Sequence, residues 1–180
     1  MKIPFFDYSA VYQKHRAAFQ NIFDNVGSRG AFIMQEDLEN FENKIAQYSN
    51  CNYAVGVANA TDALEMLLFV AGIKKADEVI ISTHTMIATA SAISANGAIP
   101  IPVECGTDHL IDPISIEKAI TSKTKCIMPT QLNGRTANMD EICSIADKYG
   151  LLIIEDSAQS LGSKYKGKNA GTFGVGGCIS

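Results

Sequence analysis

Residues 151–156, with the sequence Leu-Leu-Ile-Ile-Glu-Asp, constrain the fold more than any other segment of the chain. Four consecutive apolar residues are typical of a strand buried on both faces, and such strands belong to parallel sheets. The acidic pair follows the apolar run directly, and small polar residues come next. The strand therefore places a carboxylate at its carboxyl end, which is the edge where open α/β sheets bind ligands.

Asp156 has two interpretations at this point. A buried carboxylate needs a cationic partner, and no basic residue lies within seven positions of Asp156 on either side. The partner in that case is supplied by a ligand. In the alternative interpretation, Asp156 simply caps the helix that follows.

The rest of the chain predicts an α/β fold, because segments of strand and helix alternate along it. We expect two amphipathic helices first, at residues 8–25 and 37–48. The expected strands cover residues 53–57, 78–82, 99–103, 125–129 and 151–154, and the expected helices between them cover residues 61–71, 85–96, 115–120 and 139–149. This order implies a mainly parallel sheet with helices on both faces. Residues 163–165 and 177–180 read as short, partly antiparallel strands that need partners beyond the chain.

Composition excludes several classes of protein. A formal net charge of −4 gives no electrostatic reason to bind nucleic acid. No apolar run is long enough for a signal peptide or a membrane span, so we expect a cytoplasmic location and no membrane partner.

Lysines at 164, 166 and 168 alternate as on one solvated strand face. The five cysteines are widely separated and indicate reduced, buried thiols rather than disulfides or a zinc site: Cys51, Cys105, Cys126, Cys143 and Cys178.

Residues 57–64, Val-Ala-Asn-Ala-Thr-Asp-Ala-Leu, place small side chains between the first expected strand and a helix. Free backbone N–H groups at such a helix start, together with the Thr61 hydroxyl, offer a site for a phosphate. A simpler interpretation is that Asn59 or Thr61 only caps the helix. The glycine-rich run 171–177 does not match a dinucleotide-binding loop, because it follows no long parallel strand and opens no helix.

Four segments together resemble one known family, the DegT/DnrJ/EryC1/StrS sugar aminotransferases. They are VANATDAL at 57–64, HTMIATASA at 84–92, QLNGRTANMDEI at 131–142 and the stretch from EDSAQSLG to GGCIS at 155–180. The resemblance is colinear from Ile3 to Ser180. It implies a fold-type I enzyme that uses pyridoxal 5′-phosphate (PLP), and it makes residues 1–180 the N-terminal part of the PLP-binding large domain, without the C-terminal domain.

The resemblance also assigns cofactor contacts. Asp156 matches the aspartate that pairs with the pyridine nitrogen of PLP, and Gln159 matches a side chain beside the ring hydroxyl. Ala60, Thr61 and Ser180 match positions that hold the phosphate. In a separate segment, Met86 stands where the family stacks an aromatic ring on the cofactor, and a thioether can cover a ring face instead.

Two further residues are candidates for substrate contact. His84 lies two residues before the stacking position and is a candidate to contact the substrate. The alternative, with equal weight, is that His84 is a solvent-facing loop residue. Gln131 stands where the family commonly has histidine, in a loop with Asn133 and Arg135, and a plain turn at 133–134 is the other interpretation. No metal ligand is expected. The resemblance places the lysine that forms the Schiff base with PLP beyond Ser180, so no catalytic residue is assigned within the chain, which we expect to be inactive alone.

The resemblance implies transfer of an amino group, with glutamate as donor, to a nucleotide-linked keto-sugar in surface polysaccharide or amino-sugar biosynthesis. Such enzymes are homodimers. One alternative is a PLP-dependent sugar dehydratase, the branch in which histidine replaces the lysine. Another is a nonenzymatic remnant that associates with an intact homologue.

Overall fold

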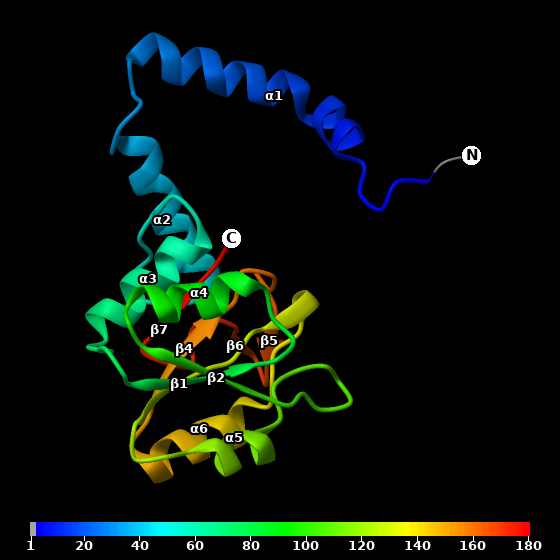
Figure 1. Ribbon diagram of the computed structural model, residues 1–180. Helices are drawn as coiled ribbons and strands as arrows, with labels where there is room; N and C mark the ends of the chain where they lie inside the picture. The colour runs from blue at the N-terminus through cyan, green and yellow to red at the C-terminus, as the bar shows by residue number, and fades with distance from the viewer. Residues whose placement is uncertain (1–2) are drawn as a thin grey trace.

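A computed structural model describes residues 3–180 and shows an α/β domain built on a five-stranded sheet (Figure 1). The spatial order of the strands is β2-β1-β3-β4-β7, and every neighbouring pair is parallel. Their bounds are β1 Glu78–Ser82, β2 Ile99–Val103, β3 Thr124–Met128, β4 Leu152–Asp156 and β7 Gly176–Cys178. The predicted parallel sheet is therefore confirmed, and the bounds of β1 and β2 match the prediction.

Helices cover both faces of the sheet (Figure 1). Helices α3 (Ala60–Val70) and α4 (Ile87–Ala95) lie on one face, and α5 (Pro113–Ala119) and α6 (Met139–Tyr149) lie on the other. Successive strand residues point to opposite faces, so each strand serves two apolar cores. In β1, Val79 and Ile81 pack with α3 and α4, whereas Ile80 packs with α5 and α6.

Two helices precede this domain: α1 (Tyr8–Arg29) and α2 (Glu36–Ser49). Asp7 caps the start of α1, its side chain accepting the Ala10 N–H at 2.9 Å. No residue of α1 is buried, and the helix projects away from the sheet (Figure 1). The end of α2 contacts the domain directly, because the buried Asn169 donates its Nδ2 to the Ser49 carbonyl at 2.9 Å.

The strand predicted at residues 53–57 is absent, and that prediction is wrong. A strand needs a neighbour for its backbone hydrogen bonds, and none of the described residues pairs with this segment. The Val55 side chain is exposed, and the Gly56 N–H donates instead to the Glu42 carboxylate at 2.7 Å. The segment therefore reaches α3 as an irregular stretch held by α2.

The end of the chain also differs from the prediction. Strands β5 (Lys164–Tyr165) and β6 (Lys168–Asn169) pair with each other as an antiparallel hairpin. Strand β7 pairs in parallel with β4. Both therefore have partners within the chain, contrary to the expectation that residues 163–165 and 177–180 need partners beyond it.

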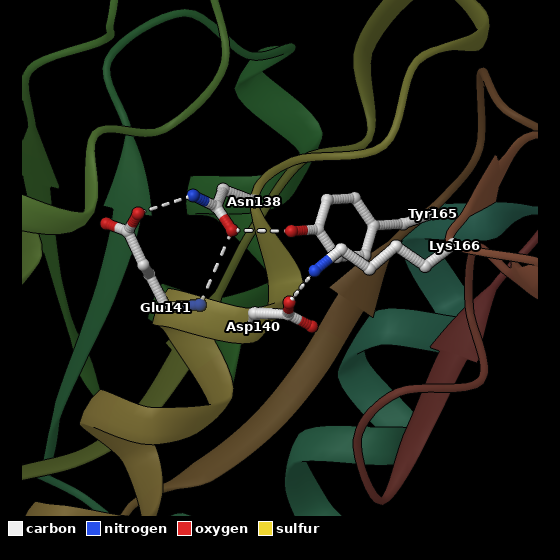
Figure 2. Close-up of polar contacts among 5 residues, drawn as sticks. All are labelled: Asn138, Asp140, Glu141, Tyr165 and Lys166. Carbon is white, nitrogen blue, oxygen red and sulfur yellow. Dashed lines mark hydrogen bonds and ion pairs between the residues drawn. The ribbon is translucent and has the colours of Figure 1, made fainter.

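The β5–β6 hairpin is fastened to the start of α6 (Figure 2). Its two-residue turn has positive φ angles of 48° at Lys166 and 85° at Gly167, as type I′ turns require. Tyr165 donates its hydroxyl to Asn138 Oδ1 at 2.8 Å, and the same oxygen accepts the Glu141 N–H at 3.4 Å to cap α6. Lys166 forms an ion pair with Asp140. The three lysines thus lie on a hairpin rather than on one strand face.

All five cysteines are free thiols, but only Cys126 and Cys178 are buried. The other three are partly exposed, which corrects the expectation that all are buried. Burial raises the pKa of both Cys126 and Cys178 to about 12.

Within residues 3–180, no helix has the length and hydropathy that a bilayer crossing requires, and no cluster of three or more His, Cys, Asp or Glu side chains is arranged to hold a metal.

Candidate functional site

The candidate residues come from separate segments that meet at the carboxyl edge of the sheet. His84 and Met86 follow β1, Gln131 follows β3, Asp156 ends β4, Gln159 follows it, and Ser180 follows β7. Parallel strands end at the same edge, so these positions form one group.

The start of α3 lies at this edge as well. The carboxyl end of α3 leads into the beginning of β1, so the helix runs antiparallel to the strands and its first residues, Ala60 and Thr61, lie near the strand ends. The helix packs against both β4 and β7. Ala60 and Ala158 border the same apolar core, which also contains Cys178.

Asp156 is buried, with 5% of its surface exposed. Its Oδ2 accepts the Thr89 hydroxyl at 2.6 Å, and its Oδ1 accepts the Ala158 N–H at 3.3 Å and the Cys178 thiol at 3.5 Å. Among the described residues, no Lys, Arg or His forms an ion pair with this carboxylate. Within residues 3–180, this buried acidic group therefore has hydrogen-bond donors but no cationic partner.

The helix-cap interpretation of Asp156 is wrong, because no helix follows β4 among residues 157–180. Residues 157–163 form turns that lead to β5. The bond from the Ala158 N–H stabilises the first of these turns.

The Cys178 thiol is the third donor to Asp156. Burial, reinforced by the negative charge of Asp156, raises the pKa of Cys178 to about 12. The thiol therefore keeps its proton at neutral pH and donates to the carboxylate without placing a second negative charge beside it.

Three threonines form a connected group behind Asp156 that sequence analysis missed. Thr130 Oγ1 lies 2.8 Å from Thr85 Oγ1, Thr85 Oγ1 lies 2.7 Å from Thr89 Oγ1, and Thr89 Oγ1 reaches Asp156. The available signal was the spacing of Thr85 and Thr89 by four residues, one helical turn, within the segment HTMIATASA.

The first turn of α3 contains backbone N–H groups that donate to no described residue. Asn59 caps the helix, its Oδ1 accepting the Asp62 N–H at 3.0 Å. None of the hydrogen bonds between described residues uses the N–H groups of Ala60 and Thr61. The cap interpretation is confirmed for Asn59, and the two amides remain free of partners among the described residues.

Gln131 follows β3 toward this edge, but its side chain turns into the protein. It is fully buried, its Nε2 donates to Glu155 Oε2 at 2.7 Å, and its Oε1 accepts the Ala137 N–H at 2.7 Å. Glu155 also accepts the N–H groups of Gly171 at 2.9 Å and Phe173 at 2.6 Å. Burial raises the pKa of Glu155, against the opposing effect of these donors.

The remaining candidates are exposed. Met86 is 65% exposed and immediately precedes α4. His84 is exposed and its ring meets the His109 ring edge to face, with centroids 5.9 Å apart. Ser180 is exposed at the end of the described residues.

Gln159 connects two loops of the edge. Its Oε1 accepts the Asn133 N–H at 3.2 Å, and its carbonyl accepts the Gly134 N–H at 3.0 Å. Asn133 and Gly134 have positive φ angles of 54° and 74°, which confirms the turn predicted there. The turn and the loop after β4 therefore support each other, and Arg135 follows in extended backbone.

Comparison with known proteins gives a consistent result. Residues 13–180 match the DegT/DnrJ/EryC1/StrS aminotransferase family. A curated relative is the dTDP-3-amino-3,4,6-trideoxy-alpha-D-glucose transaminase of Streptomyces venezuelae, which is 39% identical over 99% of this chain and 52% of its own length. The chain thus spans about half the length of the curated relatives it matches.

Solved structures show the same relationship. A DegT DnrJ EryC1 StrS aminotransferase from Brucella abortus superposes with a TM-score of 0.95 at 31% identity, over 99% of this chain and 50% of that one. NtdA from Bacillus subtilis, solved with bound cofactor PMP, has a TM-score of 0.89 at 34% identity, over 94% of this chain and 40% of that one. The fold, the order of the motifs and these matches agree, and the chain belongs to the DegT/DnrJ/EryC1/StrS aminotransferase family.

Proposed function

We propose that this chain is the cofactor-binding part of a PLP-dependent aminotransferase that acts on a nucleotide-linked keto-sugar. The observation that carries the proposal is the buried carboxylate of Asp156, which ends β4 without a cationic partner among the described residues. Family membership supports it, and relatives such as the Streptomyces venezuelae transaminase act on nucleotide-linked sugars.

The residues at the carboxyl edge fit a phosphorylated, cationic cofactor. The two available N–H groups at the start of α3 suit its phosphate, with Thr61 and Ser180 supplying hydroxyls. Asp156 suits a protonated ring nitrogen. Met86, exposed at the start of α4, is available to cover the ring, and Gln159 is available to the ring hydroxyl.

When bound, PLP supplies an electron sink for the carbanion formed at the substrate carbon. Asp156 holds the proton on the ring nitrogen in this proposal, and the amides of Ala60 and Thr61 orient the cofactor through its phosphate. The lysine that moves the proton in this reaction is not assigned to any residue of this chain. In this proposal, residues 1–180 form the N-terminal part of the PLP-binding large domain, in line with relatives about twice as long.

Finer parts of the proposal concern partners. Glutamate is the amino donor, the product serves surface polysaccharide or amino-sugar biosynthesis, and the whole protein is a cytoplasmic homodimer. His84 is the exposed candidate for substrate contact. Gln131, which has both amide atoms engaged inside the protein, contributes by holding the loop after β3 in place.

The proposal is tested by PLP binding to the chain. Equilibrium dialysis at neutral pH is expected to show one PLP per chain, with no lysine adduct trapped by borohydride. Asp156→Asn is expected to weaken binding by roughly 10- to 100-fold, the equivalent of a charge-assisted bond of about 1.5–3 kcal/mol. Asp24→Asn, an exposed change on α1, serves as the control. Equal affinity in wild type and Asp156→Asn would remove Asp156 from the site.

A further inference from the structure

We propose that Thr130, Thr85 and Thr89 form an ordered chain of hydroxyl groups that positions the Asp156 carboxylate for the ring nitrogen of the cofactor. This inference rests on the proposed function for the identity of the ligand. The three threonines are positioning residues, because they act through Asp156 and need not touch the cofactor themselves.

The chain of hydroxyl groups joins segments that are distant in sequence. Thr85 lies between β1 and α4, Thr89 lies inside α4, and Thr130 follows β3. The bonds of 2.8, 2.7 and 2.6 Å that link Thr130, Thr85, Thr89 and Asp156 are all at or below the usual length for hydroxyl donors. Thr89 is fully buried, Thr130 is 4% exposed and Thr85 is partly exposed, so the bond from Thr89 to Asp156 is the one shielded from water.

The direction of the chain follows from counting protons. Each hydroxyl has one proton to donate, and an ionised carboxylate only accepts. Thr89 gives its proton to Asp156, so it must accept from Thr85. Thr130 in turn donates to Thr85. All three protons therefore point toward Asp156, and each bond polarises the next.

The orientation of the Asp156 carboxylate depends on this chain of hydroxyl groups. An ionised carboxylate has about four acceptor positions. Thr89 fills one on Oδ2, and the Ala158 N–H and the Cys178 thiol share Oδ1 at longer distances. The Thr89 bond is the shortest of the three and fixes rotation of the carboxylate, which leaves one position on Oδ2 for an incoming N–H donor.

Thr89 has a local alternative that it does not use. A threonine inside a helix commonly bonds back to a carbonyl one turn earlier. Here the hydroxyl crosses from α4 to the end of β4 instead, and the bond joins residues 67 positions apart. A valine would fill the same volume within α4, so the hydroxyl itself is the feature that the arrangement uses.

The first test uses the 180-residue protein without ligand. A double-mutant cycle combines Thr89→Val with Asp156→Ala and measures the unfolding equilibrium in urea. We expect the two changes to be coupled by roughly tenfold in the unfolding constant, the range of a charge-assisted hydrogen bond. Thr124→Val is the matched control, because Thr124 is also buried and lies at the opposite edge of the sheet, where it donates to Glu78 at 3.3 Å. Coupling below about twofold would overturn the inference.

The second test compares two ligands: PLP and its 1-deaza analogue, in which carbon replaces the ring nitrogen. Thr89→Val is expected to weaken PLP binding by roughly tenfold while changing binding of the analogue by less than about twofold. Thr89→Ser, which keeps the hydroxyl, is expected to restore PLP binding. Thr85→Val, one step further from Asp156, is expected to show the same selectivity with a smaller effect.

The outcomes separate the two proposals. Equal weakening of both ligands by Thr89→Val assigns Thr89 a purely structural role and overturns the inference. A wild-type chain that binds neither ligand, or binds both equally, contradicts the proposed function instead. In that case the double-mutant cycle still decides whether Thr89 positions Asp156.

Discussion

Asp156 and Glu155 are neighbours in β4 but serve opposite faces of the sheet. Asp156 binds Thr89 on α4, whereas Glu155 binds Gln131, which also contacts Met139 at the start of α6. Alternation along a strand produces this separation. Asp156 therefore belongs to the face on which we propose the cofactor site, while Glu155 organises the loops on the other face.

Replacing Glu155 by Gln is expected to destabilise the protein. The new NH₂ group would face the N–H donors of Gly171, Phe173 or Gln131, leaving at least one buried donor without an acceptor. Such a loss costs about 1–3 kcal/mol, measurable by urea denaturation. Glu39→Gln, exposed on α2, is the control. A Glu155→Gln variant as stable as wild type would show that these bonds contribute nothing net.

Glu155 also makes stability depend on pH. Burial raises the pKa of Glu155 above its ordinary value of 4.5. At pH values between 4.5 and this higher pKa, the folded protein therefore binds more protons than the unfolded protein does. The free energy of unfolding therefore falls as pH rises through that window and then levels off. Subtracting the profile of Glu155→Gln, which lacks this titration, isolates the effect. A difference that increases with pH would contradict the assignment.

The cysteines should differ in reactivity. Cys126 and Cys178 are buried with pKa values raised to about 12, so neither forms the reactive thiolate at pH near neutrality. Cys51, Cys105 and Cys143 are partly exposed. Limited alkylation of the folded chain followed by peptide mass spectrometry should modify these three before the buried pair. Early modification of Cys178 would contradict its placement beside Asp156.

Tyr165→Phe tests the attachment of the β5–β6 hairpin to α6. The change removes the 2.8 Å hydrogen bond to Asn138 and keeps the ring contact with Phe173. We expect a loss of about 1 kcal/mol in the free energy of unfolding. Tyr12→Phe, on the partly exposed face of α1, should have no effect. An unchanged stability for Tyr165→Phe would show that the bond does not hold the hairpin.

The sequence predicted the sheet well because its strands carry strong local signals. The apolar run before Glu155 indicated a buried parallel strand, and the prediction that Asp156 stands at its end is confirmed. The helix at residues 139–149 was predicted with its observed bounds, since Asn138 supplies a cap and Gly150 ends the helix.

Other features depend on contacts that the sequence does not display. Residues 53–57 have a strand-like composition, but a strand also needs a neighbour. Gln131 sits in a loop segment, yet its burial depends on Glu155, 24 residues away. Thr89 lies in an apolar helix where a threonine usually bonds locally, so its bond to Asp156 becomes visible only when β1, β3 and β4 are placed side by side.

The protonation state of the bound cofactor tests the central claim most directly. With ¹⁵N-labelled PLP bound to the chain, the ring-nitrogen chemical shift is expected to be that of a pyridinium, and to remain so at a pH where free PLP has lost this proton. Asp156→Asn is expected to return the shift to the neutral value. A neutral ring nitrogen in the wild-type complex, or a shift unaffected by Asp156→Asn, would contradict the account.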